Sequence, residues 1–278
     1  MLPSVLTVAA LFLAPLAMTG WISLHDWPLL GKITFAGLEN YVRAADDSTF
    51  SSSFGFTTRY VIVSGVITFV LGFALALLVR GGLPGTAVLR TAYFLPVSIG
   101  WAVASFLWVW LLNSQVGAAT ELLRSIGAVG SEFEWFTRAD RAFVVLVALT
   151  VWKSAGFAMI VFLIGMQSVL KDLYEAARVD GASWWQEIRY VMLPLIRPTL
   201  VLVSLFLVTA FYLGFDQFFI LTRGGPGTET ASVVYWIYNN AFVRFHLGYA
   251  SALSLIFLAL LIVLNGLQVR LLRKDVTQ

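Results

Sequence analysis

Six long apolar segments, separated by more polar ones, dominate the pattern of hydrophobic positions along this chain. Each holds about 18 or more mostly apolar residues, the length that a helix needs to cross ~30 Å of hydrocarbon. In lipid a helix pairs its own backbone N–H and C=O groups, so helices are the expected structure. The pattern therefore predicts an all-α, polytopic membrane protein with six transmembrane helices in one domain, residues 1–278. The predicted spans are residues 3–24, 57–80, 91–112, 142–165, 199–221 and 248–272.

The composition agrees with a bilayer protein, because 59% of the residues are hydrophobic, 15% aromatic and only 12% charged. With a mean hydropathy of +0.86, these values lie outside the range of soluble domains. The first apolar segment could instead be a signal peptide, since its apolar stretch ends in small residues. It lacks a basic leading region, however, and its apolar character resumes through Trp21 and Ile22. We therefore expect a first spanning helix.

The distribution of Lys and Arg predicts which ends of the helices face the cytoplasm. Three short segments, at about residues 80–90, 166–198 and beyond 268, hold nine of the 18 basic residues. The segments on the other side are longer in total and hold eight, with most of the acidic residues. The positive-inside rule then places the three short segments and both termini in the cytoplasm. The chain has no cysteine, so it can form neither a disulfide framework nor a thiolate metal site.

One charged segment, residues 166–198, lies between the fourth and fifth apolar segments and carries two helix-start signals. Asp172 and Glu175 form a capping-box pattern that predicts a short helix starting at the next residue, 173. Gly181 is suited to end this helix in a left-handed turn. Ser183 and Gln186 repeat the start signal. The segment is therefore predicted to be a helix, a sharp turn and a second helix.

The second of these helices is predicted to cover residues 184–193 and to stop at Pro194, while Pro198 opens the next span at its first turn. Small side chains would let another protein's backbone approach the first helix and the turn, and charges lie at the rim. By spacing alone, the segment could equally be a solvated loop between spans. The small residues are Ala176, Ala177 and Ala182, and the charged ones are Glu175, Arg178 and Asp180.

The letters from Glu175 to Pro198, EAARVDGASWWQEIRYVMLPLIRP, resemble the EAA signature of permease subunits of binding-protein-dependent ABC importers. Residues 221–242, LTRGGPGTETASVVYWIYNNAF, are similar to the loop after the fifth helix in the carbohydrate-type permeases, such as those for maltose and glycerol-3-phosphate. Residues 35–50, FAGLENYVRAADDSTF, are similar to the extracytoplasmic segment after the first helix. The resemblance thus covers nearly the whole chain.

The resemblance implies the MetI-like permease fold in a prokaryotic cell membrane, with this chain forming half of an importer. It implies as partners a second homologous permease, two ATPase subunits, an extracellular or periplasmic solute-binding protein, membrane lipid and a small hydrophilic substrate, but no nucleic acid. It also implies that a short coupling helix sits in a cleft of the ATPase subunit, with Gly181 as the hinge. The predicted docking residues are Glu175, Ala176, Ala177, Arg178, Asp180, Gly181 and Ala182. The sequence departs from the family pattern early in the second helix. The family often has a Phe there, whereas this sequence has Trp184 and Trp185 and then Glu187.

Catalytic and nucleotide-binding motifs are missing from the sequence. There is no GxxxxGK[ST] phosphate loop, and the one Gly-Lys pair, Gly31 and Lys32, lacks the upstream glycine. There is no HExxH or GxSxG motif, and His25 and His246 are the only imidazoles. We therefore expect no enzyme activity, cofactor or metal in this chain, with ATP and Mg bound by a partner ATPase.

Two ionisable residues lie inside apolar segments, where a charge is costly and usually faces a pathway or a partner. Lys153 is midway along the fourth segment and Asp216 is in the fifth, followed by Gln217. The two charges could pair with each other. Alternatively, they could line a central cavity with Tyr212 and bind a polyhydroxy ligand. Asn113 at the end of the third segment is a weaker candidate for the same pathway.

The loop after the fifth segment contains Gly224, Gly225 and Pro226, a composition typical of a chain reversal. The resemblance implies that this loop, which also includes Thr230, forms a gate or scoop that touches the solute-binding protein. The substrate implied is a sugar, an oligosaccharide or a glycerol-phosphate derivative. The alternative functions are an ion-coupled secondary transporter, which would carry its own coupling-ion site, and a membrane scaffold.

Overall fold

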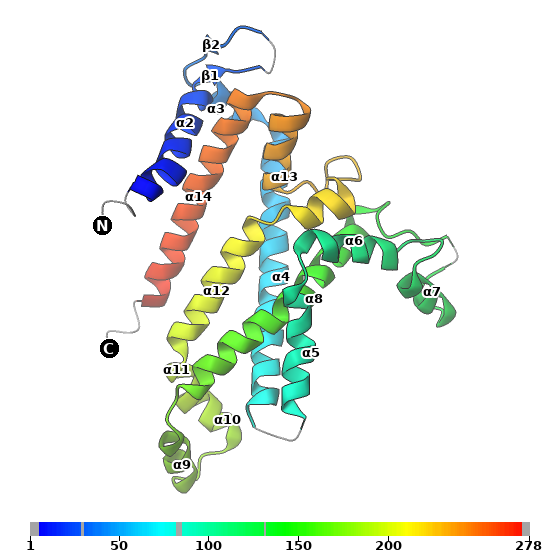
Figure 1. Ribbon diagram of the computed structural model, residues 1–278. Coiled ribbons are helices and arrows are strands. Elements are labelled where there is room, and N and C mark those ends of the chain that lie inside the picture. Colours follow the sequence, from blue (N-terminus) through cyan, green and yellow to red (C-terminus); the bar gives the residue numbers. More distant parts are fainter. Residues whose placement is uncertain (1–5, 29–30, 82–84, 131, 274–278) are drawn as a thin grey trace.

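The computed structural model describes residues 6–28, 31–81, 85–130 and 132–273, most of which are helical (Figure 1). Four described helices are long and apolar enough to cross a membrane, and two bent pairs of helices pass the same test together. The number of spans is therefore between four and six, in an all-α polytopic fold. The first span is helical from Leu6 to Ser23, and its predicted start at residue 3 lies outside the described residues.

The elements divide into long helices and short connecting ones. The long ones are η1 and α2 (Ala9–Leu13 and Ala14–Ser23), α4 (Ser48–Arg80), α5 (Thr86–Ser98), α6 (Trp101–Leu111), α8 (Ala139–Gln167), α12 (Arg197–Tyr212) and α14 (Leu247–Arg273). The short ones are α3 (Glu39–Asp46), α7 (Ala118–Ser125), α9 (Lys171–Val179), α10 (Trp184–Gln186), η2 (Glu187–Met192), α11 (Leu193–Leu195), η3 (Phe218–Thr222), α13 (Val233–Tyr238) and η4 (Asn239–Val243). Strands β1 (His25–Asp26) and β2 (Thr34–Phe35) pair antiparallel, with His25 opposite Phe35.

The molecule has two distinct ends. Figure 1 shows α9 and α10 at one end, where α4 also finishes and α5 begins; we call this the α9 end. At the opposite end, the hairpin end, lie β1, β2, α3 and the start of α14. Helices α4, α8 and α14 run toward the α9 end, whereas α5 and α12 run back from it. The alternation is that of a chain crossing a bilayer repeatedly.

The third predicted span is wrong as a single helix. The chain forms α5 and then α6, which are bent by 98° at a break after Ser98. Ile99 and Gly100 are extended at the break, with ψ of 134° and 147°. The apolar pattern registers length and hydropathy but not direction, so it could not detect this turn. Gly100 before a new helix was the available signal, because glycine is poorly suited to a helix interior.

Two other spans differ from the prediction at their ends. The fifth helix ends at Tyr212 and not at residue 221, because the chain leaves the helix at Leu213 to Phe215 before a short π-helical turn. The second begins at Ser48 and not at residue 57, because the Asp47 carboxylate accepts the backbone N–H groups of Thr49 and Phe50. This cap lets polar residues form the first turns of α4.

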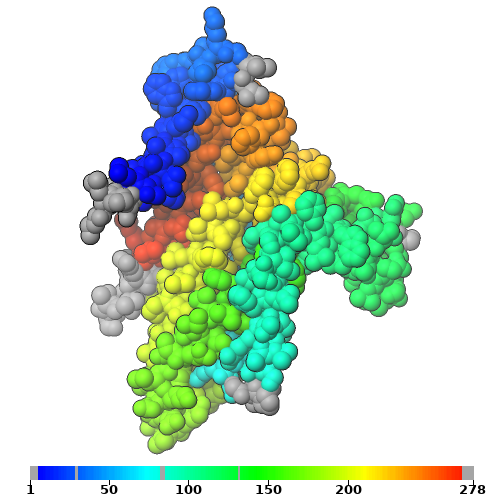
Figure 2. Space-filling model, viewed as in Figure 1, coloured from blue at the N-terminus to red at the C-terminus, as the bar shows by residue number. Residues whose placement is uncertain are grey.

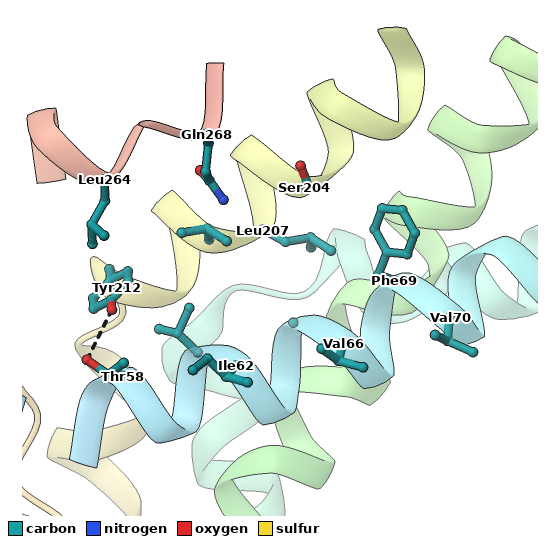
Figure 3. Close-up of a pocket in the computed structure, with 13 residues that line it drawn as sticks. Thr58, Ile62, Val66, Phe69, Val70, Ser204, Leu207, Tyr212, Leu264 and Gln268 are labelled. Atoms are coloured by element: carbon teal, nitrogen blue, oxygen red, sulfur yellow. Dashed lines mark hydrogen bonds between the residues drawn. The ribbon is translucent and has the colours of Figure 1, made fainter. Parts of the chain in front are cut away.

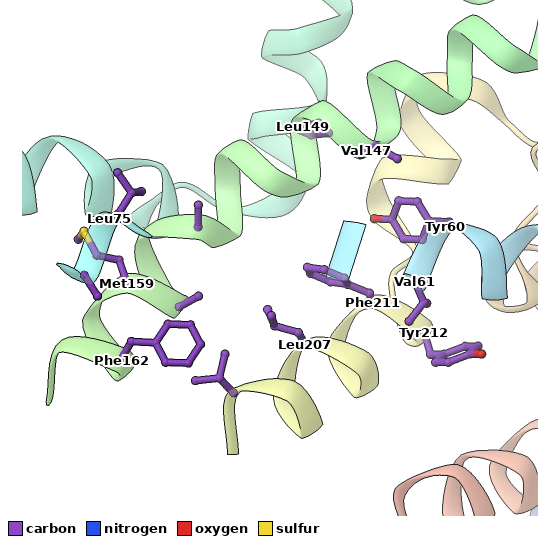
Figure 4. Packing of buried hydrophobic residues seen from close by; sticks show 14 of the residues in the cluster. Tyr60, Val61, Leu75, Val147, Leu149, Met159, Phe162, Leu207, Phe211 and Tyr212 are labelled. Carbon is purple, nitrogen blue, oxygen red and sulfur yellow. The ribbon is translucent and has the colours of Figure 1, made fainter. Parts of the chain in front are cut away.

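The core is centred on the packing of α4 against α8, with α5 and α12 on their flanks (Figure 4). Gly72 brings the two helices together, since a Cβ there would lie 2.6 Å from the Cβ of Ala158. In lipid there is no hydrophobic drive between helices, so close approach of this kind supplies the van der Waals contact that holds them. The largest fully buried side chains include Tyr60, Leu146, Leu149, Met159, Phe162 and Phe218.

Two parts project from this core. Helix α2 packs along α14, and only 6% of its spanning window is buried inside the chain. Helices α6 and α7 form an arm that extends sideways from the body (Figure 2). Both parts expose large apolar side chains, such as Met18 at 60% and Phe106 at 64%. Such surfaces are suited to lipid or to another membrane subunit.

Candidate functional site

The predicted helix, turn and helix of the charged segment are present at the α9 end. Helix α9 ends at Val179, and Gly181 takes the left-handed conformation with φ of +82°. Ser183 and Gln186 form both hydrogen bonds of a capping box and start α10. These three sequence signals are therefore confirmed, because glycine tolerates positive φ and the cap satisfies free N–H groups.

Two details of that segment were predicted wrongly. Helix α9 starts at Lys171 after the extended Leu170 and has no side-chain cap, so Asp172 lies inside its first turn. A carboxylate there still favours the helix through the positive end of its dipole. The second helix does not stop at Pro194 but continues to Leu195, since the π-helical η2 directly before it widens the backbone ladder. Pro198 does lie in the first turn of α12.

The predicted docking residues lie on a projecting surface. Five of them are exposed, whereas Ala177 and Ala182 are half-buried. Apolar side chains surround them, including Val179, which is 87% exposed, and Trp185, which is 71% exposed. Clustered exposed apolar groups of this kind are typical of a surface that binds another protein. The exposed docking residues are Glu175, Ala176, Arg178, Asp180 and Gly181.

Arg178 was expected to offer its charge at the rim of the docking surface, but its guanidinium pairs with a residue of the same segment, Glu187. Its Nε donates to Oε1 of Glu187 at 2.7 Å, and its Nη2 donates to Oε2 at 3.2 Å. These hydrogen bonds, with the charge of Glu187, raise the pKa of Arg178. Glu187 itself is 7% exposed. Sequence reasoning had noted Glu187 only as a departure from a pattern, because nothing in the letters indicates a pair across a turn.

Lys153 does not pair with Asp216. From α8 its Nζ donates to the backbone carbonyls of Pro96 and Ile99, and it lies 5.0 Å from the centre of the Trp101 ring. The Pro96 carbonyl also accepts the Ile99 N–H at 3.3 Å, so Lys153 adds to the hydrogen bonding at the break between α5 and α6. A cation there also suits the negative end of the α5 dipole. Lys153 on α8 thus stabilises the bend between α5 and α6.

Gln217 performs a similar task at the break after α12. Its Nε2 donates to Tyr60 Oη at 3.2 Å, and Tyr60 also shares a hydrogen bond with Thr150. All three side chains are buried. Their hydrogen bonds connect the break after α12 to α4 and α8. Gly214 makes room for it, because a Cβ there would overlap the Gln217 amide. Tyr60 was missed, although its hydroxyl belongs to a polar stripe of α4 at helical spacing: Ser53, Thr57, Tyr60, Ser64 and Thr68.

The other pathway candidates divide into two kinds. Asp216 is half-buried at the break itself, beside Gln217. Tyr212 is buried at the end of α12 and donates to Thr58 Oγ1 at 3.1 Å. Asn113, by contrast, caps the turn after α6, where its Oδ1 accepts the N–H groups of Gln115 and Val116. Asn113 therefore shapes a turn.

The two broken spans touch, since α6 packs on η3. Non-helical backbone at membrane depth is tolerated only where it is buried in protein or lines a water-filled cavity. Broken helices of this kind carry the polar binding groups of many transporters. Among the described residues there is no group of three or more His, Cys, Asp or Glu side chains that could hold a metal ion. The chemistry available at the breaks is hydrogen bonding.

An apolar groove lies elsewhere, between α4, α12 and α14, with a volume of about 500 Å³ (Figure 3). Its walls are mainly aliphatic and aromatic side chains such as Ile62, Val66 and Leu207. The Tyr212 to Thr58 hydrogen bond lies at one edge. A polyhydroxy solute needs convergent polar groups, so this groove is unsuited to one.

The predicted outer loop forms a compact turn near the start of α13. Gly224 has φ of +79°, and a Cβ there would lie 2.7 Å from the Tyr235 ring. Thr230 is fully buried; its N–H donates to the Gly224 carbonyl and its Oγ1 to the Gly225 carbonyl at 2.6 Å. The loop is thus held by its own hydrogen bonds, with Pro226 half-buried.

Comparisons with known proteins agree with this geometry. Residues 68–274 match the family model described as "Binding-protein-dependent transport system inner membrane component". The chain is 32% identical, over 98% of its length and 92% of the relative's, to a probable starch degradation products transport system permease protein of Thermoanaerobacterium thermosulfurigenes. It is 33% identical, over 86% of its length and 80% of the relative's, to a trehalose/maltose transport system permease protein of Thermococcus litoralis.

Solved structures share the fold. All of this chain aligns with 94% of a chain in a bacterial ABC transporter involved in the import of the acidic polysaccharide alginate, with a TM-score of 0.87 and 24% identity. An amino acid ABC transporter aligns less closely, with a TM-score of 0.55 over 84% of this chain and 97% of that chain. Because the matched family model covers most of the sequence, the chain belongs to the inner membrane components of binding-protein-dependent transport systems.

Proposed function

We propose that this chain forms half of the translocation path of an ATP-driven importer for a sugar, an oligosaccharide or a glycerol-phosphate derivative. The observation that carries the proposal is the exposed α9 surface, with its left-handed turn at Gly181, on a bundle whose two broken spans meet. The other half would be a second homologous permease. Two ATPase subunits would bind ATP and Mg in their own sites, and one of them would dock on the α9 surface. A solute-binding protein would deliver the small hydrophilic substrate at the opposite end.

The proposed orientation follows from the basic residues. The α9 end carries many of them, and cytoplasmic loops are enriched in Lys and Arg. The α9 end is then cytoplasmic, with the start of the first span and the end of the last on the same side. The basic residues concerned are Arg80, Arg90, Lys171, Arg178, Arg189 and Arg197.

The substrate would pass the paired breaks. Asp216 offers a half-buried carboxylate beside Gln217 at the break after α12, and a carboxylate makes charge-assisted hydrogen bonds to sugar hydroxyls. Tyr212, the last residue of α12, adds an aromatic ring before the break. The substrate class is supported by the relatives already described and by a further one, an sn-glycerol-3-phosphate transport system permease protein of Agrobacterium fabrum, 30% identical over 87% of this chain.

The test is a transport measurement in proteoliposomes. They contain the full complex, purified from cells that express this chain with its partner subunits. We expect a second permease and an ATPase to co-purify, and uptake from the binding protein to require ATP. Uptake should survive collapse of the ion gradients. ATP-independent uptake driven by a gradient would contradict the proposal and favour a secondary transporter.

The Gly181 turn gives a matched pair of variants. Gly181→Val should lower ATP-driven uptake by about tenfold or more, because a β-branched residue is strained at φ of +82° and would displace α9. Gly85→Val is the control, since Gly85 is at the same end with φ of +91°. A Cβ added at either glycine would have no neighbouring atom within 4 Å. It should affect uptake little. Equal losses in both variants would count against a special role for the turn.

A further inference from the structure

The two arms of the α9 surface are joined by an ion pair between the exposed Arg178 and the buried Glu187. Arg178 is near the end of α9 and Glu187 opens η2, so their bidentate pair spans the turn at Gly181. A Glu187 carboxylate that is 7% exposed needs such a partner, because an uncompensated buried charge is costly. The turn itself is closed by backbone hydrogen bonds, from the Gly181 N–H to the Arg178 carbonyl at 3.0 Å and from the Ala182 N–H to the Ala177 carbonyl at 2.9 Å. The ion pair adds a side-chain link across the turn.

A second arginine connects both arms to the spanning bundle. Arg80 is the last residue of α4, and its guanidinium lies 4.2 Å from the ring centre of Tyr174 on α9. Its Nη1 also lies 3.2 Å from the sulfur of Met192 at the end of η2. A polar cavity of about 310 Å³ lies between the end of α4 and the two arms, lined by Leu77, Arg80, Gly81, Arg178, Trp184 and Glu187.

The contacts of α9 suggest why both arginines matter. Among the described elements, η2 is the one against which α9 mainly packs. Without a brace, a push on α9 would bend the chain at Gly181, since glycine has the widest range of backbone conformations. With both arms fixed to each other and to the end of α4, the same push would move α4 and the helices packed on it.

We propose that Arg178, Glu187 and Arg80 form a brace across the Gly181 turn that makes the coupling segment rigid and transmits its movement to α4. These are positioning residues, and they touch no substrate. The inference rests on the proposed function, because it assigns a role in coupling ATP hydrolysis to transport. It differs from docking, which depends on the outer surface of α9.

The decisive experiment is a charge exchange in the purified complex, with uptake and ATP hydrolysis measured together in proteoliposomes. Arg178→Glu and Glu187→Arg should each lower the ratio of solute transported to ATP hydrolysed by about fivefold or more, a typical lower bound for a lost coupling free energy. The double variant R178E/E187R restores the pair and should recover the ratio to within about twofold. The control is the exposed pair Arg138 and Asp140 at the start of α8, far from the α9 end (Figure 1). Arg138→Glu should leave the ratio unchanged.

Arg80 has its own pair of variants. Arg80→Met should lower the ratio, because it removes the charge over the Tyr174 ring and the contact with Met192. Tyr174→Phe should not, since the ring remains and the Tyr174 hydroxyl has no hydrogen-bond partner in the described structure. If the single charge reversals prevent assembly, R178C/E187C in this cysteine-free chain replaces them, with the ratio measured before and after a thiol cross-linker bridges the two positions. Only the bridged form should couple.

The outcomes separate the two proposals. Normal coupling in the single variants, or a double variant that stays uncoupled although its ATPase is bound, would overturn the brace and leave the importer intact. A coupling ratio unaffected by the cross-linker would overturn it as well. A wild-type chain with which no ATPase co-purifies would instead remove the proposed function.

Discussion

At the scale of single residues, the polar side chains of this apolar protein work mainly at places where a helix stops. Lys153 donates to two backbone carbonyls at the α5 to α6 bend, and Gln217 anchors the break after α12. Asp47 caps α4. Sequence reasoning assigned Lys153 to the pathway or to a pair with Asp216, because a charge in an apolar segment shows that a partner is needed but not which one.

Asp47 gives a prediction on pH dependence. Burial would raise the pKa of its carboxyl, but hydrogen bonds from the Tyr249 hydroxyl, the Phe50 N–H, the Trp236 indole and the Thr49 N–H hold that pKa below its usual value. A group with a lowered pKa stabilises the fold above its unfolded pKa, and this stabilisation is lost as the pH falls through the folded value.

Asp47→Asn should therefore unfold more easily than wild type near neutral pH, by about 1–2 kcal/mol from the weakened cap and hydrogen bonds. Wild type should lose more stability than the variant as the pH falls from about 5 to about 2, since the two proteins differ only in this carboxylate, whose stabilisation is lost below its unfolded pKa. Thermal unfolding in detergent, followed by tryptophan fluorescence, measures both. Parallel loss of stability in the two proteins would show that Asp47 is not the titrating group.

At the scale of elements, the sequence located the spans well and their interruptions poorly. Apolar length predicted α8 and α14 to within a few residues, because hydropathy reports which residues leave water. The bend after Ser98 and the break after Tyr212 depend on partners distant in sequence, Lys153 and Tyr60. The short capped turn at Gly181 was predictable, since its signals are local. The Arg178 to Glu187 pair was not, because it forms across that turn.

Glycines on α4 provide an element-scale prediction. Gly72→Ala should destabilise the protein, because the new Cβ would press on Ala158 and on the backbone of α8. Gly65→Ala on the same helix has no neighbouring atom within 4 Å and should be neutral or stabilising by up to about 1 kcal/mol. The midpoints of thermal unfolding in detergent compare the two. A Gly72→Ala protein as stable as wild type would mean that α4 and α8 can separate at no cost.

At the scale of the whole molecule, the charge distribution predicts which end faces the cytoplasm, and the lack of cysteine makes this testable. Val179→Cys is at the α9 end and Phe35→Cys at the hairpin end, where the native side chains are 87% and 74% exposed. A membrane-impermeant maleimide should label Val179→Cys only in inside-out vesicles and Phe35→Cys only in right-side-out ones. The reverse labelling would invert the orientation and place the α9 surface out of reach of any ATPase.

The seating of α2 on α14 has a consequence for how the protein is made. Helix α2 finds its main neighbour in α14, which is synthesised about two hundred residues later. During translation α2 must therefore wait in lipid, apolar on nearly all sides, until α14 leaves the ribosome. Closure of this pair completes the fold, and an early stop in synthesis would leave α2 stranded without its main contact.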